Sequence, residues 1–482
     1  MKLRYIEEPS LQFGVGQHIC PKQGVSSYSP FDHDQVRPER ITLGIIGKSE
    51  SIEKVLAWLD TCKSLISGKQ SKNPHPKLFP SFPGFNKKTG FLCDITWDDS
   101  YIRKLNNSEF DTIIRKHENL EDRIKDIGQL YLDEIKFLAK NKNPDVILCA
   151  LNENFITYIT EDTVQPNLEE EDKESGKENE EVEAEISKKE QNFRRHLKAH
   201  AMQYNVPIQI VRDRIAKPTG EMQDAATIAW NFFTALYYKA SGTPWAMIRK
   251  DAAETTCYAG ISFFKSRDRE TTQTSLAQIF NELGKGIILR GEEVVLKKND
   301  RTPHLTADQA FNLLKVSMKE YYEAVKIFPK RLVIHKTSNY SEDEIYGFRQ
   351  AANELHINQI DFVTIQPADI RLYRQGSYPP MRGTHFWITE ESHILYTRGS
   401  VPYYETYPGK YIPSPLEIKL AAYDESPNII CNEILSLTKM NWNNTQFDRK
   451  FPITIECARN VGEILKYLGE NDEMQLKYSF YM

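Results

Sequence analysis

Five polar residues in the first half of the chain have side chains of the kind that bind a terminal phosphate. They are Arg194, Arg195 and Lys198 in NFRRHLKAHAMQYN, Gln209 in VPIQIV, and Lys239 in YYKASGTPW. Such a phosphate needs several converging donors, because guanidinium or ammonium groups supply charge and an amide supplies orientation. The spacing alone leaves a simpler explanation open, since a basic helix face is commonly just solvated.

Two further patterns could suit a metal ion or a nucleotide. His196 and His200 are four residues apart, which places both on one face of a helix. The residues between them read LKA, so the HExxH motif is absent and we favour histidines that face solvent or phosphate. In GIIGKSES, Thr42 stands where a phosphate-binding loop needs its first glycine, so we expect no such loop.

The elements that must position these residues begin with an α/β domain, which we expect to span residues 1–240. Its apolar strands RITLGIIG, DVILCALN and VPIQIVRD alternate with amphipathic helices. Strands that are apolar throughout are typical of a parallel, Rossmann-like sheet covered on both faces. Residues 161–191 are strongly acidic and lack aromatic residues, so they are predicted to be a disordered insertion.

The remaining residues, 241–482, have more closely spaced strands. TTCYAGISFFKS (255–266) reads as a buried strand in which Ser262 follows Gly260 and Ile261. GIILRG and EEVVLKK are expected to form a hairpin, RLVIHKTS is another buried strand, and TIECARNVGEILKYLG is predicted to be a helix. Such a meander, followed by alternating helices and strands, is compatible with an RNase H-like domain.

The composition indicates an ordinary globular protein of 482 residues, with 40% hydrophobic and 27% charged residues. The net charge of the chain is −5, but residues 161–191 carry much of the acid, so the rest of the chain has a net positive charge. The seven cysteines form no CxxC pair, which favours a reducing cytosol. We find no signal peptide and no apolar run long enough for a membrane span, so we expect a cytoplasmic protein.

Four segments together resemble a known family: YIEEPSLQFG, FRRHLKAHAMQYNVPIQIVRD, ALYYKASGTPW and PITIECARNVGEIL. In this order they look like a short prokaryotic Argonaute. Such a protein has a Rossmann-like MID domain, then an RNase H-like PIWI domain, and no N or PAZ domain. The resemblance spans essentially the whole chain.

The resemblance implies a site for the 5′-phosphate of a guide. Lys198, Gln209 and Lys239 match the family's phosphate-binding positions, and Arg194 stands where many relatives carry tyrosine. An arginine there can stack on a base or contact phosphate. The resemblance also implies a structural Mg²⁺, held by the guide phosphate and the C-terminal carboxylate of Met482.

The resemblance further implies that the PIWI domain does not cut. Catalytic PIWI domains hold two metal ions with acidic side chains. The matching positions are Ser262, Thr337 (or its neighbour Lys336) and Arg459, so we expect neither catalysis nor a catalytic metal. Arg195, Lys336 and Arg459 are then candidates for nucleic-acid contact, with drifted surface positions as the alternative for the last two.

Partners follow from the same resemblance: a guide RNA, a complementary single-stranded DNA target, and an APAZ-domain effector protein. Chain and effector would form a heterodimer, or a higher oligomer on target binding. The effector is a TIR domain, a sirtuin-like NAD hydrolase or a nuclease, and we expect an NAD-consuming one in antiviral or anti-plasmid defence by abortive infection. The alternative hypothesis is a metal-dependent, guide-directed endonuclease that uses Glu292, Glu293 and Asp343.

Overall fold

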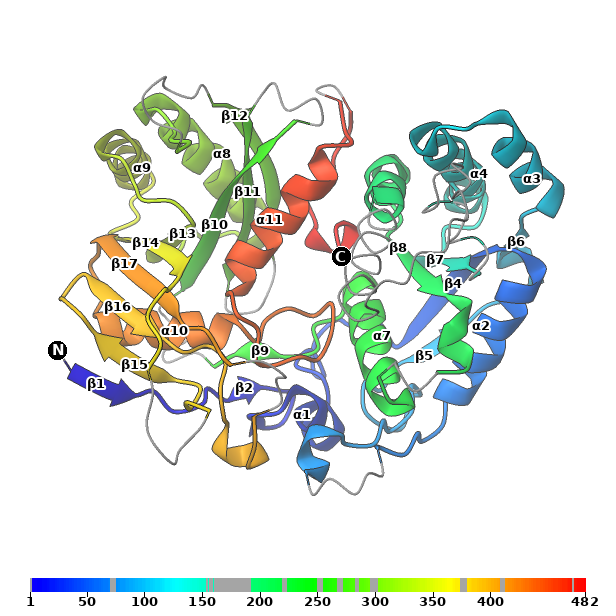
Figure 1. Ribbon diagram of the computed structural model, residues 1–482, viewed down its shortest axis with the longest axis horizontal. Helices are drawn as coiled ribbons and strands as arrows, with labels where there is room; N and C mark the ends of the chain where they lie inside the picture. The colour runs from blue at the N-terminus through cyan, green and yellow to red at the C-terminus, as the bar shows by residue number, and fades with distance from the viewer. Residues whose placement is uncertain are drawn as a thin grey trace, which may run out of the picture.

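The computed structural model describes residues 2–69, 75–152, 155, 159, 192–218, 223–248, 255–266, 272–281, 286–294, 302–372, 379–407, 412–469 and 472–482. Two α/β halves lie side by side, with helix α11 (Ile453–Leu465) and the end of the chain between them (Figure 1). The predicted acidic insertion, residues 161–191, lies outside the described residues. No helix in the described ranges has the length and apolar character needed to span a bilayer.

The first half is built on a parallel sheet, as predicted. Its strand order is β5-β4-β7-β8, and β6 also pairs with β4; every pair is parallel. The strands are β4 (Arg40–Gly47), β5 (Asp94–Thr96), β6 (Ile102–Lys104), β7 (Val146–Leu151) and β8 (Ile208–Arg212).

Helices cover both faces of this sheet. Ile45 packs in a core with α2 and α7, whereas its neighbour Ile46 packs in a second core with α3, α4 and the helix of residues 192–201. This alternation explains why β4 is apolar throughout. The helices are α1 (Pro21–Tyr28), α2 (Ser49–Cys62), α3 (Asn107–Lys116), α4 (Leu120–Asn141) and α7 (Ala225–Lys239).

The second half contains a nine-stranded sheet of order β1-β15-β16-β17-β14-β13-β10-β11-β12. Strand β10 is parallel to β13, and β13 to β14, whereas the other neighbours are antiparallel. The strands are β1 (Lys2–Tyr5), β10 (Thr256–Lys265), β11 (Thr272–Asn281), β12 (Ile288–Glu293), β13 (Arg331–Lys336), β14 (Gln359–Pro367), β15 (Thr384–Trp387), β16 (Ser392–Leu395) and β17 (Leu416–Ala422).

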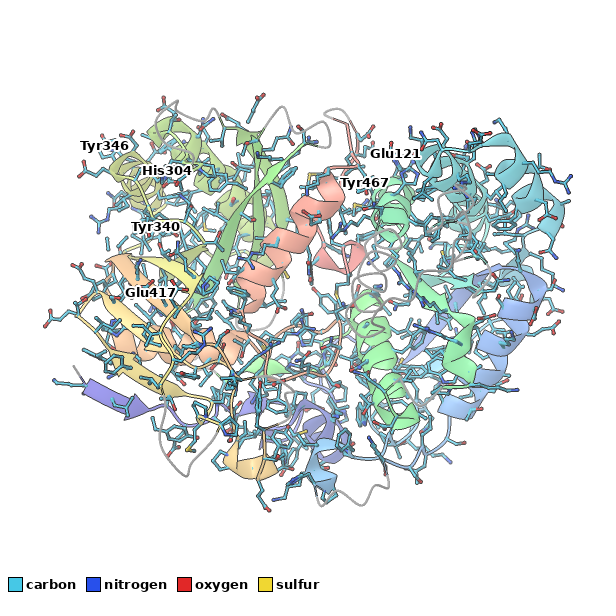
Figure 2. The ribbon with its side chains drawn as sticks, viewed as in Figure 1. Glu121, His304, Tyr340, Tyr346, Glu417 and Tyr467 are labelled. Atoms are coloured by element: carbon cyan, nitrogen blue, oxygen red, sulfur yellow. The ribbon has the colours of Figure 1, made fainter. Side chains whose placement is uncertain are left out.

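Two helix pairs enclose this sheet. Helices α8 (Ala307–Val325) and α9 (Glu342–Glu354) share a core with β10 and β13, and Tyr346 on α9 points outward (Figure 2). Helices α10 (Pro427–Leu437) and α11 pack in the core that reaches the first half. Short 3-10 helices occur at Pro76–Leu78, Asp99–Tyr101, Met202–Tyr204, Asp213–Ala216, Pro402–Tyr404 and Tyr478–Phe480.

The predicted hairpin of GIILRG and EEVVLKK is wrong. Strand β12 runs through Gly291 without turning, and its antiparallel partner is β11, which precedes it in the chain. A Cβ atom at Gly291 would lie 2.9 Å from Cβ of Thr274 on that neighbouring strand. This glycine therefore permits close packing between two strands, which sequence reading mistook for a turn.

The predicted division at residue 240 also needs correction, because the start of the chain belongs to the second half. Strand β1 pairs with β15 in the nine-stranded sheet. The next strands, β2 (Leu11–Gln12) and β3 (Gln17–His18), form a small sheet with β9 (Ala246–Met247) between the halves. The start of the chain therefore contributes one strand to the sheet of the second half and two strands to the small sheet between the halves.

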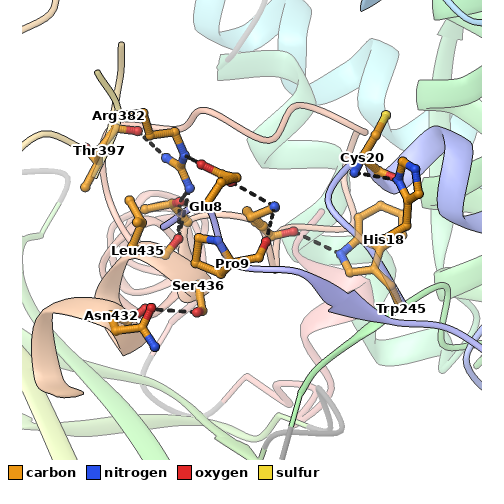
Figure 3. A network of polar contacts seen from close by, with 12 residues as sticks. Glu8, Pro9, His18, Cys20, Trp245, Arg382, Thr397, Asn432, Leu435 and Ser436 are labelled. Carbon is orange, nitrogen blue, oxygen red and sulfur yellow. Dashed lines mark hydrogen bonds and ion pairs between the residues drawn. The ribbon is translucent and has the colours of Figure 1, made fainter. Parts of the chain in front are cut away.

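A buried ionic network holds the segment after β1 in place. Glu8 accepts hydrogen bonds from Arg382 Nε (2.7 Å) and Lys439 Nζ (2.8 Å), and all three side chains are buried (Figure 3). Burial would raise the pKa of Glu8, but the charges and hydrogen bonds of Arg382 and Lys439 outweigh burial and lower it. The N-terminal segment is therefore held by a permanently ionised carboxylate at neutral pH.

Candidate nucleic-acid interface

Lys239 lies at the centre of the first candidate site. Helix α7 starts with Asp224, whose side chain caps Thr227 N, and ends with Lys239, which is only 4% exposed. The ammonium group donates to Ile208 O (2.9 Å), to Oε1 of Gln209, and to the main-chain oxygen of Met482 (3.2 Å). The structure thus brings together three residues that the sequence analysis grouped, although they lie far apart in the chain.

The cations around Lys239 are crowded. Burial, and then the charges of Arg194 and Arg195, lower the pKa of Lys198 to about 7. Burial and the nearby charges of Lys198 and Arg194 likewise lower the pKa of Lys239 well below its ordinary value. Burial and the charge of Arg214 lower the pKa of Arg194 to about 10. A group of positive charges held this close favours an anionic ligand.

An open depression of about 400 Å³ adjoins this group at the carboxyl end of β8. We call it the arginine depression, because Arg194, Arg212 and Arg214 line it together with Gln209. No carboxylate from the described residues lines it. Asn231 and Asn443 complete its polar wall.

Sequence reasoning missed Arg212 and Arg214, although one signal could have found them. Ligands of open parallel sheets bind beyond the carboxyl ends of the strands, and VRDR follows the apolar run of β8. Asp213, the acidic residue between them, is buried and accepts from Ser51 Oγ (3.2 Å) and Lys54 Nζ (3.3 Å) on α2. Its charge is therefore engaged on the helix side of the sheet.

A second cavity, of about 740 Å³, lies between the halves. Glu121 and Arg195 line it from the first half, and Arg459 and Tyr467 from the second; Figure 2 labels Glu121 and Tyr467. Arg195 Nη1 forms an ion pair with Glu463 Oε2 (3.0 Å) on α11, so the predicted nucleic-acid contact bridges the two halves. We call this space the central cavity.

Two of the three positions that the sequence analysis compared with catalytic acids meet in the central cavity. Ser262 on β10 and Arg459 on α11 both line it. Thr337, directly after β13, does not line it, and its main-chain oxygen accepts from Gln366 Nε2 (2.8 Å). The described wall of the cavity therefore has a hydroxyl group and a guanidinium group at two of the positions compared with catalytic acids.

Close packing of α11 on the sheet sets the position of Arg459. A Cβ atom at Gly260 would lie 2.2 Å from the main-chain oxygen of Thr454 in the first turn of α11. Thr454 Oγ1 also lies 2.8 Å from Nδ1 of His335 on β13. Burial lowers the pKa of His335 to about 3, so this contact involves a neutral imidazole.

The prediction that Lys336 contacts nucleic acid is wrong, because this side chain is fully buried. Its ammonium group binds Glu344 Oε1 (2.5 Å), which caps α9, and also donates to Asn339 O (3.2 Å). Lys336 therefore anchors α9 to the end of β13. Burial lowers its pKa, and the charge of Glu344 opposes that effect.

The alternative acidic set does not gather in one place. Glu292 and Glu293 lie at the end of the edge strand β12, and Asp343 lies in the first turn of α9. Among the described residues, no three His, Cys, Asp or Glu side chains are placed to hold a metal ion. The rings of His196 and His200 are 4.4 Å apart. The expectation that both face solvent or phosphate is wrong for His196, because this side chain is buried and packs on Gly128 of α4.

Comparisons with known proteins point to one fold. No protein-family model and no curated protein matches the sequence. The chain is similar to Clostridium butyricum Argonaute bound to a guide DNA and a 19-mer target DNA (TM-score 0.61, 14% identity, covering 98% of this chain and 53% of that one). It is also similar to Marinitoga piezophila Argonaute in complex with 5′ OH guide RNA (TM-score 0.57, 12% identity, covering 100% of this chain and 59% of that one). A third similar structure is Drosophila Piwi (TM-score 0.56, 13% identity, covering 96% of this chain and 54% of that one).

These likenesses establish the fold at low sequence identity. The chain is matched almost throughout, yet it spans little more than half the length of each of these proteins. Both halves described above are included in the match, because 96% or more of the chain is covered. The chain therefore has the mixed α/β, MID–PIWI fold of the Argonaute proteins.

Proposed function

We propose that this protein binds a 5′-phosphorylated guide in the arginine depression and uses it to recognise a complementary nucleic acid. The observation that carries this proposal is the depression itself, whose wall brings three guanidinium groups and the Gln209 amide to one open space. Guanidinium groups bind phosphate oxygens in a bidentate manner, so this lining suits a terminal phosphate. Lys198 does not line the depression, but it lies near enough to Arg194 for their charges to interact.

The guide is proposed to be RNA and the target single-stranded DNA. Base pairing would supply sequence specificity, while the protein binds the end and backbone of the guide. The central cavity, with Lys265 and Arg459 in its wall beside the ion pair of Arg195 with Glu463, suits the backbone of the paired strands. Two structurally similar Argonautes were solved with a guide, which supports this class of ligand.

Target binding is proposed to occur without cleavage by this chain. A two-metal nuclease needs acidic ligands on both sides of the scissile phosphate. Ser262 and Arg459 occupy the central cavity instead, and a guanidinium group there repels divalent cations while attracting a phosphate backbone. Arg459 stacks on Phe451, with its guanidinium carbon 4.4 Å from the ring centre, which fixes its direction.

Because this chain is proposed to bind its target without cutting it, a partner protein has to produce the response to target binding. We propose a heterodimer with an APAZ-domain effector protein, most simply an NAD-consuming one, that is activated when guide and target pair in defence against plasmids or phages.

The test compares 5′-phosphorylated and 5′-hydroxyl RNA of one sequence by fluorescence anisotropy with the full chain. We expect the phosphorylated guide to bind about tenfold or more tightly, which corresponds to about 1.4 kcal/mol. Gln209→Ala and Arg214→Ala should abolish this preference, whereas Lys217→Ala, an exposed control outside the arginine depression, should retain it.

A labelled complementary DNA, added with Mg²⁺ or Mn²⁺, tests the second half of the proposal. We expect an intact target that stays bound to the guide-loaded protein. Cleavage that survives repurification would support the endonuclease alternative. Equal affinity for both guide ends would show that the arginine depression is not a phosphate site.

A further inference from the structure

Three main-chain or amide oxygen atoms surround one buried nitrogen at the arginine depression. They belong to Ile208, Gln209 and Met482, and each accepts a hydrogen bond from Lys239 Nζ. Oxygen atoms gathered in this way are the ligands that Mg²⁺ prefers. Here, however, an ammonium group lies among them, and it has one N–H donor for each oxygen.

This arrangement does not fit the Mg²⁺ that the sequence analysis expected at Met482. One oxygen of Met482, the residue expected to bind Mg²⁺ through its carboxylate, is already engaged by Lys239 at 3.2 Å. Lys198 and Arg194 lie close enough to Lys239 to influence its ionisation, so a divalent cation would enter a region that is already positive. In addition, Mg²⁺ needs several oxygen ligands in octahedral geometry, and no three acidic or histidine side chains gather in the described part of the chain.

Lys239 also decides which end of the Gln209 amide is available. An ammonium group can only donate, so it holds Oε1 of Gln209 and leaves Nε2 as the second polar atom of that amide. Within the described residues, no hydrogen bond from Nε2 is found, and Gln209 lines the arginine depression. The amide is therefore orientated to donate to an anion.

We infer that the phosphate site of this protein works without a metal ion: Lys239 takes the place of the cation, and Arg194, Arg212 and Arg214 neutralise the phosphate directly. Lys239 is a positioning residue in this scheme, because all three of its N–H donors are used inside the protein. The inference rests on the proposed function, since it concerns the same ligand, a terminal phosphate on a nucleic acid.

The experiment measures the preference for 5′-phosphorylated over 5′-hydroxyl RNA in EDTA and again in Mg²⁺, with the full chain. We expect the ratio of the two dissociation constants to agree within about twofold between the two buffers. A preference that is present in Mg²⁺ and absent in EDTA would overturn the inference and leave the proposed function standing. No preference in either buffer would instead overturn the proposed function.

Substitution of Lys239 by alanine tests whether this residue takes the place of the metal ion. Lys239→Ala leaves three oxygen atoms without their cation, so its phosphate preference should be lost in EDTA and partly restored by Mg²⁺. A purely structural role for Lys239 would give a loss that Mg²⁺ does not change. If Lys239→Ala does not fold, Arg212→Ala is measured in its place. An equal loss of the phosphate preference in both buffers supports direct neutralisation of the phosphate by arginine. An unchanged preference overturns the inference.

Discussion

At the scale of single residues, the arginine depression depends on cations that the fold holds close together. Lys198 forms no hydrogen bond with the described residues, and burial together with two arginines lowers its pKa to about 7. The unfolded chain keeps this proton up to the ordinary lysine pKa of about 10.4. Between these values the unfolded state binds more protons, so raising the pH through this window favours folding.

The same shift predicts how guide binding depends on pH. Above about pH 6.5 the terminal phosphate is mostly a dianion, and further change then comes from the protein. As the pH rises through 7, Lys198 loses its charge in the free protein, so affinity for the phosphorylated guide should fall. Anisotropy titrations from about pH 6.5 to pH 8.5 measure this slope.

Lys198→Met provides the control, because it removes the titrating group. Its affinity should be lower at pH 6.5 and nearly independent of pH above it. Affinity of the unaltered protein that rises with pH would contradict the assignment of Lys198 to the phosphate site.

Site residues were predictable from sequence only where the chain keeps a family pattern. Gln209 and Lys239 lie in segments that resemble Argonautes, and the structure brings them together. Lys336 was misplaced because its burial depends on Glu344, a helix cap that no local pattern links to β13. Arg212 lies near the end of a segment that resembles Argonautes but matched none of the family's phosphate-binding positions, and Arg214 lies just beyond that segment, so only the topology of a parallel sheet points to them.

At the scale of elements, the contact between β10 and α11 positions the wall of the central cavity. Gly260→Ala would place a Cβ atom 2.2 Å from the Thr454 main-chain oxygen, so α11 has to move. We expect the free energy of unfolding to fall by about 1–3 kcal/mol, as for other overpacked cores. Denaturant unfolding measures this change, and binding of a guide–target duplex should weaken in parallel.

Gly469→Ala is the matched control, because the nearest atom to its added Cβ would lie 3.4 Å away. It should leave the unfolding midpoint close to that of the unaltered protein. Equal effects of the two substitutions would show that the contact with Thr454 does not limit the packing of α11.

Most elements were predictable because their apolar patterns are continuous. RITLGIIG, VPIQIVRD and RLVIHKTS correspond to β4, β8 and β13. Strand β12 was misread because a glycine inside a strand looks like a turn until the neighbouring strand is known. The pairing of β1 with β15 joins segments almost 400 residues apart, which is beyond any local pattern.

At the scale of the whole molecule, the Glu8 network joins the start of the chain to the second half. Glu8→Gln removes the carboxylate that pairs with two buried cations, Arg382 and Lys439, and leaves both cations in place. Breaking such a network typically costs about 3–5 kcal/mol of stability. Chemical denaturation should show a loss of this size, whereas Glu7→Gln, at an exposed neighbouring position, should show almost none.

Strand β1 and Met482 each contribute to the half of the molecule that lies farther from them in sequence. The first residues complete the sheet of the second half, and the last residue binds Lys239 in the first half. A single break in the polypeptide after α7 would leave each fragment with a piece that the other requires. We therefore expect neither fragment to complete its own half of the fold unless the other fragment is present.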